Sequence, residues 1–353
     1  FKIYSLRVYF FYVSLCFISC ILSENQIVSL GKLLFLLLEV LIICFLCHCF
    51  MTNQMTDQNK LELIETLWKR LVNLIYLLIV VILIAWLTAP AYQEGLYVTV
   101  TDRMSGGQWF MWGPNFLGQF SAIGILISSS RLLFCKQKFV NLVMLILSLY
   151  IFWECQSRTS IISLLLGIFV IFYYSKPVFK LTIFSGVSVL SFLGIFLYSD
   201  ELLEFFMRGQ DLEQLSSGTG RILMYVAATE LLFSDMKSLF FGQGFYFGSR
   251  VLIPDQLSKF SLSNLDNTYL EAALNSGIFA GISLIIFMSS VIWLAIKNTD
   301  DSFPSNIEAF LVVIAIFVRS ISGPTFQQFG FDILILSIVI LKFHFTQRFF
   351  ERH

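Results

Sequence analysis

The chain has 353 residues, of which 57% are hydrophobic and only 13% are charged. Soluble globular domains carry about a quarter of charged residues, so this composition excludes an ordinary soluble fold. Lysine plus arginine and aspartate plus glutamate number 23 each, which leaves no excess positive charge to recruit nucleic acid.

Apolar runs long enough to cross a bilayer recur along most of the sequence. A crossing needs about 20 mostly apolar residues, and the runs are separated by polar residues, glycine or proline. The predicted spans are residues 4–22, 31–50, 71–90, 115–134, 138–155, 159–175, 178–199, 268–296, 306–322 and 325–345. We therefore predict an all-α, polytopic transmembrane helix bundle with about ten spans.

Lysine and arginine are distributed unevenly over the short connections between these runs. One side, together with both termini, carries Lys2, Arg7, Lys60, Lys69, Arg70, Arg131, Lys136, Lys138, Lys176, Lys180, Lys297, Lys342, Arg348 and Arg352. The short segments on the other side carry only Lys32, Arg103, Arg158 and Arg319. Because positively charged short loops stay in the cytoplasm, we predict that both termini are cytoplasmic.

One long connection, residues 200–267, lies outside the membrane in this orientation. It divides the chain into N-terminal transmembrane helices (1–199), the loop itself, and C-terminal transmembrane helices with a cytoplasmic tail (268–353). Long connections are usually functional elements or lids. Thr219, between two glycines, precedes the run 221–233, which we predict to be a short amphipathic helix at the membrane surface.

Four arginines on the outer side are the main functional signal: Arg103, Arg158, Arg221 and Arg319. A guanidinium at membrane depth costs about 2.5–3.5 kcal/mol on insertion scales, so it normally faces a cavity or a partner. A bound phosphate would be such a partner, because the planar guanidinium matches two phosphate oxygens at once. The glycine-flanked helix start at Arg221 would add backbone N–H groups aimed at the same anion.

Each arginine also has a structural interpretation. Arg158 lies four residues from Glu154, and an ion pair between them would explain its presence. Arg103 and Arg319 could extend to lipid headgroups, as long cations near helix ends commonly do. Arg221 could simply begin a helix.

A second polar cluster closes the long connection and runs from Asn264 to Gly277. Within it, Asp266 could accept the proton of an attacking sugar hydroxyl as a general base. The alternative is that Asp266 only caps the following helix.

Other polar signals are weaker. His48, His344 and His353 lie at or near cytoplasmic ends, so we predict neither a metal site nor a histidine base on the outer side. The glycine-rich stretch 242–248 lacks the dinucleotide-binding spacing and is predicted to be a flexible loop. Glu39, inside a predicted span, would suit a proton site in a transporter or a carboxylate that reaches the interface.

Several short motifs recur in a familiar order. They are Asp102-Arg103-Met104-Ser105-Gly106, Gly113-Pro114-Asn115-Phe116-Leu117-Gly118, Ser157-Arg158-Thr159-Ser160, Ser217-Gly218-Thr219-Gly220-Arg221, Phe241-Gly242-Gln243-Gly244, and Asp266-Asn267-Thr268-Tyr269-Leu270 through Gly277. In this order, around one long outer loop, they resemble the O-antigen polymerase and ligase superfamily, the Wzy-type and WaaL-type membrane glycosyltransferases. The resemblance covers residues 100–330.

The resemblance implies a metal-independent, cofactor-free transfer of glycan from undecaprenyl pyrophosphate, with inversion, on the periplasmic face of the bacterial inner membrane. In this family arginines matching Arg158 and Arg221 hold the pyrophosphate, and Asp266 stands where the base is expected. Substrate contacts are expected from Arg103, Asn115, Asn267, Tyr269 and Arg319. Family members usually have about twelve spans, which implies a further helical hairpin before Phe1.

Three functions follow as alternatives. The first is a polymerase, whose donor and acceptor are both lipid-linked oligosaccharides and whose partner is a chain-length regulator. The second is a ligase that transfers the glycan to lipid A core in lipopolysaccharide biosynthesis, although ligases typically carry a histidine where Asp266 stands. The third is a lipid-linked oligosaccharide transporter, which predicts polar residues through the helices to both faces of the bilayer.

Overall fold

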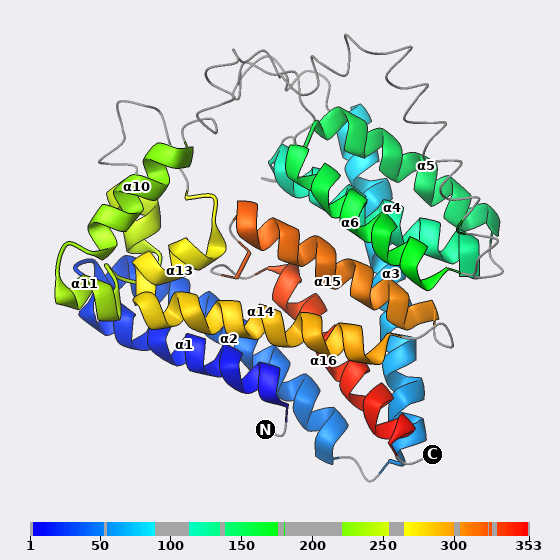
Figure 1. Cartoon of the computed structure of the whole chain (residues 1–353), viewed down its shortest axis with the longest axis horizontal. Coiled ribbons are helices and arrows are strands. Elements are labelled where there is room, and N and C mark those ends of the chain that lie inside the picture. Colours follow the sequence, from blue (N-terminus) through cyan, green and yellow to red (C-terminus); the bar gives the residue numbers. More distant parts are fainter. Residues whose placement is uncertain are drawn as a thin grey trace. The chain divides into compact units, whose positions relative to one another are not determined.

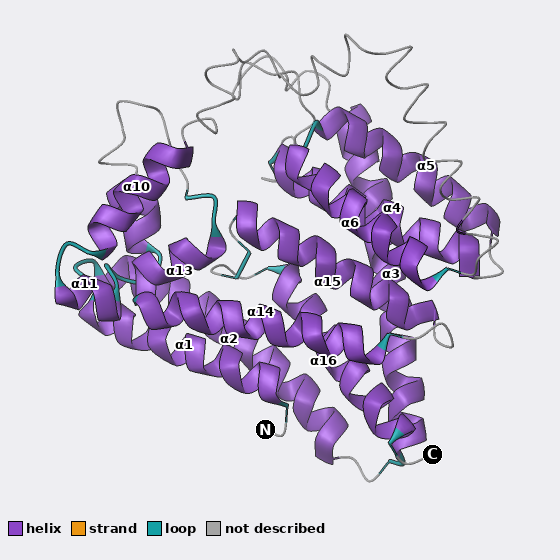
Figure 2. Ribbon diagram, in the orientation of Figure 1, coloured by secondary structure: helices purple, strands orange, loops and turns teal. Residues whose placement is uncertain are grey.

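The computed structural model describes residues 3–52, 55–88, 113–134, 138–175, 180, 221–253, 265–299, 304–323, 325–326 and 330–351. Helices account for 89% of these residues, and no strand occurs among them (Figure 2). The predicted all-α class is confirmed.

Seven helices within the described ranges are long and apolar enough to cross a membrane. They are α1 (Tyr4–Leu22), α2 (Gln26–Thr52), α3 (Asp57–Thr88), α4 (Pro114–Phe134), α5 (Lys138–Cys155), α14 (Ile278–Asn298) and α15 (Pro304–Ser322) (Figure 1). The apolar helix α6 (Arg158–Tyr174) is shorter. The chain is therefore a multi-pass membrane protein. The predicted span at 178–199 lies outside the described residues.

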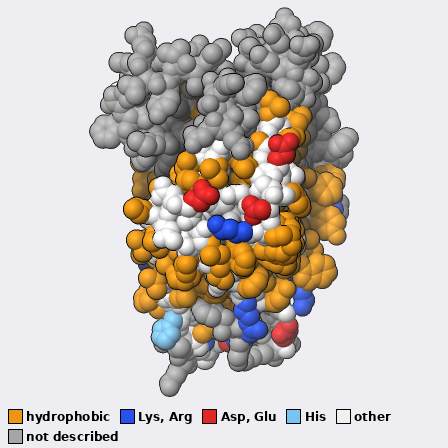
Figure 3. All heavy atoms as spheres, turned by 90° about the vertical axis from the view of Figure 1, so that its left-hand side faces the viewer, with side chains coloured by type: hydrophobic (Ala, Val, Ile, Leu, Met, Phe, Trp, Pro, Cys, Tyr) orange, Lys and Arg blue, Asp and Glu red, His pale blue; other side chains and the backbone are white. Residues whose placement is uncertain are grey.

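One face of the molecule shows the surface that a bilayer requires. In Figure 3, hydrophobic side chains form a broad belt, and charged side chains lie above and below it. Many large apolar residues of the spanning helices are exposed, among them Phe35, Leu41 and Phe45 of α2. Contiguous apolar surface of this kind is favourable against lipid and unfavourable against water.

The predicted span 268–296 is wrong in one respect, because it breaks at Gly277 into α13 (Thr268–Ser276) and α14. Gly277 has φ 89° and ψ 163°, a conformation that side-chain-bearing residues rarely adopt. A Cβ atom added there would lie 2.0 Å from the carbonyl oxygen of Phe240, at the end of α11 (Met236–Phe241). The polar run Asn275-Ser276-Gly277 marks the break in the sequence, and the predicted span passed over it. The last helix, α16 (Phe331–Phe350), likewise begins later than the predicted 325.

Gly277→Ala is expected to destabilise the protein by about 1–3 kcal/mol, because alanine would be strained at this φ and would contact the Phe240 carbonyl. Thermal unfolding of the purified protein in detergent measures the effect. The matched control is Gly31→Ala, because Gly31 lies inside α2 with nothing within 4 Å of its added Cβ. That change should be neutral or slightly stabilising, as alanine is in helix interiors. Equal melting temperatures for the two variants would contradict the strained turn.

The chain folds into two compact units. The first unit comprises Phe1–Glu65, Ser216–Asn298 and Arg319–His353, and the second comprises Thr66–Leu215 and Thr299–Val318. The predicted boundaries at residues 199 and 267 separate the membrane helices from the loop outside the membrane. They describe a different property from these two units and stay a prediction.

In the first unit, α1 packs along α14, and α13 packs against α14 and α10 (Arg221–Leu232). Met224, Ala228 and Leu232 of α10 form a buried cluster with Leu265 and Leu274. The predicted helix over 221–233 is thus confirmed, and its buried side fixes it on α13.

The second unit contains a buried polar network. Arg131 on α4 donates two hydrogen bonds to Glu308 on α15, at 2.9 and 3.0 Å. Trp68 Nε1 of α3 donates to the same carboxylate at 2.9 Å. The Arg131 guanidinium also lies 5.9 Å from the ring centre of Tyr76, whose hydroxyl donates to Asn141 Oδ1. These bonds connect α3, α4, α5 and α15.

Candidate functional site

Two segments of the long connection 200–267 contribute to one accessible ion pair in the first unit. Arg221 is the first residue of α10, and Asp266 precedes α13 by two residues. Arg221 Nη2 lies 3.2 Å from Asp266 Oδ2, and the two side chains are 29% and 26% exposed. The structure thus brings together two of the three residues predicted to carry catalysis, and both can be reached from outside.

Asp266 is held in place through its backbone. The Tyr225 hydroxyl on α10 donates to the Asp266 carbonyl at 3.1 Å. Burial raises the pKa of the Asp266 carboxyl above its ordinary value, while the Arg221 and Arg250 guanidinium groups oppose that rise. A carboxylate with a raised pKa is a stronger base than an ordinary aspartate.

The capping role considered for Asp266 belongs instead to the next residue. Asn267 Oδ1 accepts hydrogen bonds from the backbone N–H groups of Tyr269 and Leu270, at 3.1 and 2.9 Å. Asn267 is therefore the N-cap of α13. The Asp266 side chain does not cap the helix and contacts Arg221 instead.

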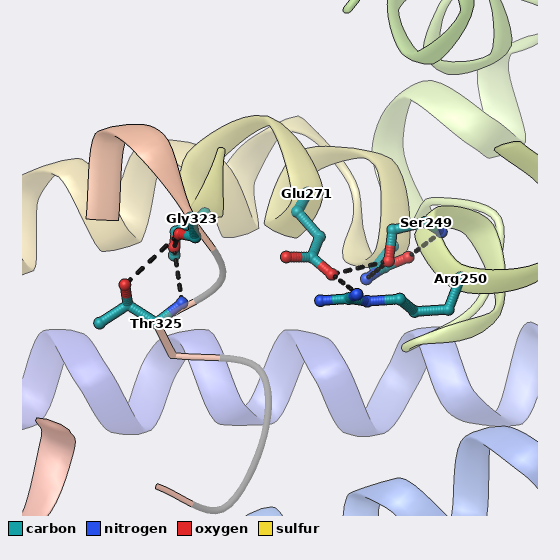
Figure 4. A network of polar contacts seen from close by, with 7 residues as sticks. Ser249, Arg250, Glu271, Gly323 and Thr325 are labelled. Carbon is teal, nitrogen blue, oxygen red and sulfur yellow. Dashed lines mark hydrogen bonds and ion pairs between the residues drawn. The ribbon is translucent and has the colours of Figure 1, made fainter. Parts of the chain in front are cut away.

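The start of α13 is fastened to the last turn of α15 and to the segment that follows it. Asn267 Nδ2 donates to the Ile321 carbonyl, and the Tyr269 hydroxyl lies 2.7 Å from Ser320 Oγ. Thr268 contacts Gly323 and Thr325, the left-hand pair in Figure 4. Asn267 and Tyr269 thus make structural contacts, and the sugar-binding role predicted for them stays a prediction.

Arg319 has a carboxylate partner that the sequence did not suggest. Its Nη1 lies 2.6 Å from Asp332 Oδ2, near the start of α16. Both side chains are largely buried. An ion pair therefore accounts for this arginine without headgroup contact, and the predicted substrate contact is untested.

The remaining predicted residues lie in the second unit or outside the described residues. Arg158 is the half-buried first residue of α6, and Asn115 is exposed near the start of α4. Their two motifs meet, since a Cβ added at Gly118 would lie 2.4 Å from Ser157 Cβ. Arg103 lies outside the described residues.

A buried network beside the ion pair was missed by sequence reasoning. Glu271, fully buried, accepts hydrogen bonds on Oε1 from Ser249 Oγ at 2.9 Å and Arg250 Nε at 3.2 Å (Figure 4). Asn275 closes the network through two hydrogen bonds with Ser249. The one available signal was a glutamate inside a predicted span, which needs a partner.

The glycine-rich stretch 242–248 begins as a hydrogen-bonded loop, and its predicted flexibility stays a prediction. The backbone N–H groups of Gln243 and Gly244 donate to carbonyls of Leu274 and Asn275, at 2.8 and 3.1 Å. The following residues, Gly248–Leu252, form the π-helical turn η3 that carries Ser249 and Arg250. Such turns are often found at functional sites.

Comparison with models of known protein families finds no match, and a search of curated proteins also finds none. Among the described residues, no group of three or more His, Cys, Asp or Glu side chains is placed to bind a metal ion. The ion pair of Arg221 and Asp266, with the residues around it, is therefore the candidate functional site.

Proposed function

We propose that this protein is an O-antigen or exopolysaccharide polymerase, a membrane glycosyltransferase that moves a growing glycan from undecaprenyl pyrophosphate onto the next lipid-linked repeat unit. The accessible contact between Arg221 and Asp266 carries the proposal. A cation that suits a pyrophosphate lies here beside a carboxylate that suits a general base, and both belong to the long outer connection.

The transfer would proceed as one displacement. The proton of the acceptor hydroxyl passes to Asp266 as its oxygen attacks the anomeric carbon of the donor sugar. The bond from that carbon to the pyrophosphate oxygen breaks, and the configuration inverts. Negative charge grows on the leaving pyrophosphate, so preorganised guanidinium groups stabilise the transition state more than the ground state. Arg221, in contact with Asp266, is the group assigned to this role, and the family resemblance assigns Arg158 to it as well.

The residue at position 266 favours polymerase over ligase. Ligases of the resembled family typically carry a histidine there, whereas this chain has an aspartate. The proposed setting is the bacterial inner membrane, with cytoplasmic termini, the site on the periplasmic face, and a chain-length regulator as partner.

The test is glycan profiling in a host that lacks its polymerase and makes the native repeat unit. Wild type is expected to restore a ladder of repeat lengths, and Arg221→Ala and Arg158→Ala are each expected to lose it. Loss of one transition-state donor commonly lowers rates by about 10²–10³-fold. Arg70→Ala, an exposed arginine on α3, is the control at matched membrane expression. A full ladder in both site variants would refute the assignment, and glycan capping restored only in a ligase-deficient host would favour the ligase.

A transporter is the second candidate, because α2 buries a carboxylate at its centre. Glu39 is fully buried, and its Oε2 accepts a hydrogen bond from Tyr9 on α1 at 3.4 Å. Intramembrane carboxylates often mark ion or substrate pathways. Translocation of a fluorescent lipid-linked oligosaccharide by proteoliposomes, lost in Glu39→Gln, would support this function over the polymerase.

A further inference from the structure

Four charged side chains of alternating sign lie around the start of α13. At the accessible end, Arg221 contacts Asp266 at 3.2 Å. At the buried end, Arg250 contacts Glu271 at 3.2 Å, and these side chains are 12% and 0% exposed. The positive charge of Arg250 also acts on Asp266. Asp266 therefore lies in the field of two guanidinium groups, of which Arg221 is in direct contact.

Arg250 is fixed much more firmly than Arg221. Its Nε donates to Glu271, and its backbone N–H donates to the Tyr246 carbonyl at 3.2 Å. The neighbouring Ser249 bonds to both Glu271 and Asn275, as the right-hand side of Figure 4 shows in part. Because Glu271 is buried, moving Arg250 away would leave a buried charge without compensation, which is strongly unfavourable.

Arg221 has a different setting. It is the first residue of its helix, and more than a quarter of its side chain is exposed. An arriving pyrophosphate would compete with Asp266 for this guanidinium. The same anion would also favour protonation of a nearby carboxylate by like-charge repulsion. A base that depended on Arg221 alone would thus lose its stabilising cation when the substrate binds.

We propose that Arg250 is a positioning residue, a fixed second cation near the start of α13 that keeps Asp266 ionised when Arg221 turns to the pyrophosphate. This inference rests on the proposed function. Arg250 is too enclosed to serve as the pyrophosphate ligand itself. Glu271 sets the position of Arg250, so the buried pair acts on the reaction through Asp266.

The pKa of Asp266 should change in one direction when Arg250 is neutralised. The charged groups that act on Asp266 within the described part of the chain are Arg221, Arg250 and Glu271, with Tyr225 beside them. Arg250 lowers the pKa of Asp266, so its neutralisation should raise that pKa. Activity that requires ionised Asp266 should then fail at a higher pH on the acid side.

The experiment compares two variants that both lack the Glu271 carboxylate, so that no buried carboxylate is left without its cation. Arg250→Gln alone would strand Glu271, whereas Glu271→Gln and the double variant Arg250→Gln/Glu271→Gln both keep a hydrogen-bonding amide at position 271. Infrared difference titration of the purified protein, with the Asp266→Asn spectrum subtracted, reports the Asp266 carboxyl. Asp266 is expected to titrate at higher pH in the double variant than in Glu271→Gln. Arg250→Lys, which keeps the charge, should stay near wild type.

The outcomes separate this inference from the proposed function. A higher titration midpoint, together with a matching shift in the acid limit of ladder synthesis, supports the positioning role. Equal midpoints in the two variants, at equal melting temperatures, overturn it. A shifted midpoint with an unchanged acid limit also overturns it, and shows that Asp266 is not the base. If wild type makes no ladder in the matched host, the proposed function fails, while the infrared midpoints still decide whether Arg250 acts on Asp266.

Discussion

Asp266→Asn is expected to slow polymer formation by about 10²–10⁴-fold at neutral pH, the usual contribution of a general base. Asparagine has the same shape and can accept a hydrogen bond from Arg221, but it cannot take a proton from the acceptor. Wild-type activity should fall as the pH drops through the pKa of Asp266, which burial places above the ordinary value for an aspartate. This acid limb should be absent in the residual activity of the variant. The rate of ladder formation by the purified protein in detergent, supplied with the lipid-linked repeat unit and measured against pH, provides both observations.

Two control variants separate loss of the base from loss of structure. Glu230→Gln removes an exposed carboxylate from α10 and should leave the rate unchanged. Asp266→Glu keeps a carboxylate but displaces it, and a shift of about 1 Å can cost about 100-fold. A rate for Asp266→Asn within threefold of wild type, at equal expression, would exclude Asp266 as the base.

The helices were predictable because each apolar run carries its own signal. Burial in lipid requires about 20 apolar residues wherever a helix crosses, so composition alone locates most of the spans. The length of the apolar run did not reveal the break at Gly277, which only the short polar run Asn275-Ser276-Gly277 marks in the sequence. The break depends on how closely Phe240 approaches, and that contact joins residues 37 positions apart in the sequence.

The site was predictable only in part, for the same reason. Arg221 and Asp266 were identified because glycines and polar residues mark helix starts, which is local information. The partners of Arg319 and Arg250 lie 13 and 21 positions away, and no periodicity indicates them. The choice between Asp266 and Asn267 as helix cap depended on one residue of register, which only the backbone geometry decides. The buried carboxylates Glu271 and Asp332 are therefore identified as partners only by the long-range packing of the chain.

The buried network of the second unit allows a large effect on stability to be predicted. Arg131→Met is expected to lower the free energy of unfolding by about 3–5 kcal/mol, because it leaves the buried Glu308 carboxylate without its cation. Trp68 would still donate to Glu308, but one neutral hydrogen bond does not compensate a buried charge. Unfolding by increasing SDS in mixed micelles, followed by tryptophan fluorescence, measures the loss.

A second substitution shows whether the loss comes from charge or from packing. In Arg131→Met/Glu308→Gln the charge is gone, while the amide oxygen can still accept the Trp68 hydrogen bond. Replacing both members of a buried pair is often close to neutral, so the double variant should recover most of the stability. Arg70→Met, at an exposed position on α3, should stay within about 0.5 kcal/mol of wild type. If the double variant were as unstable as Arg131→Met, the arginine would act by filling space beside Tyr76 rather than by neutralising Glu308.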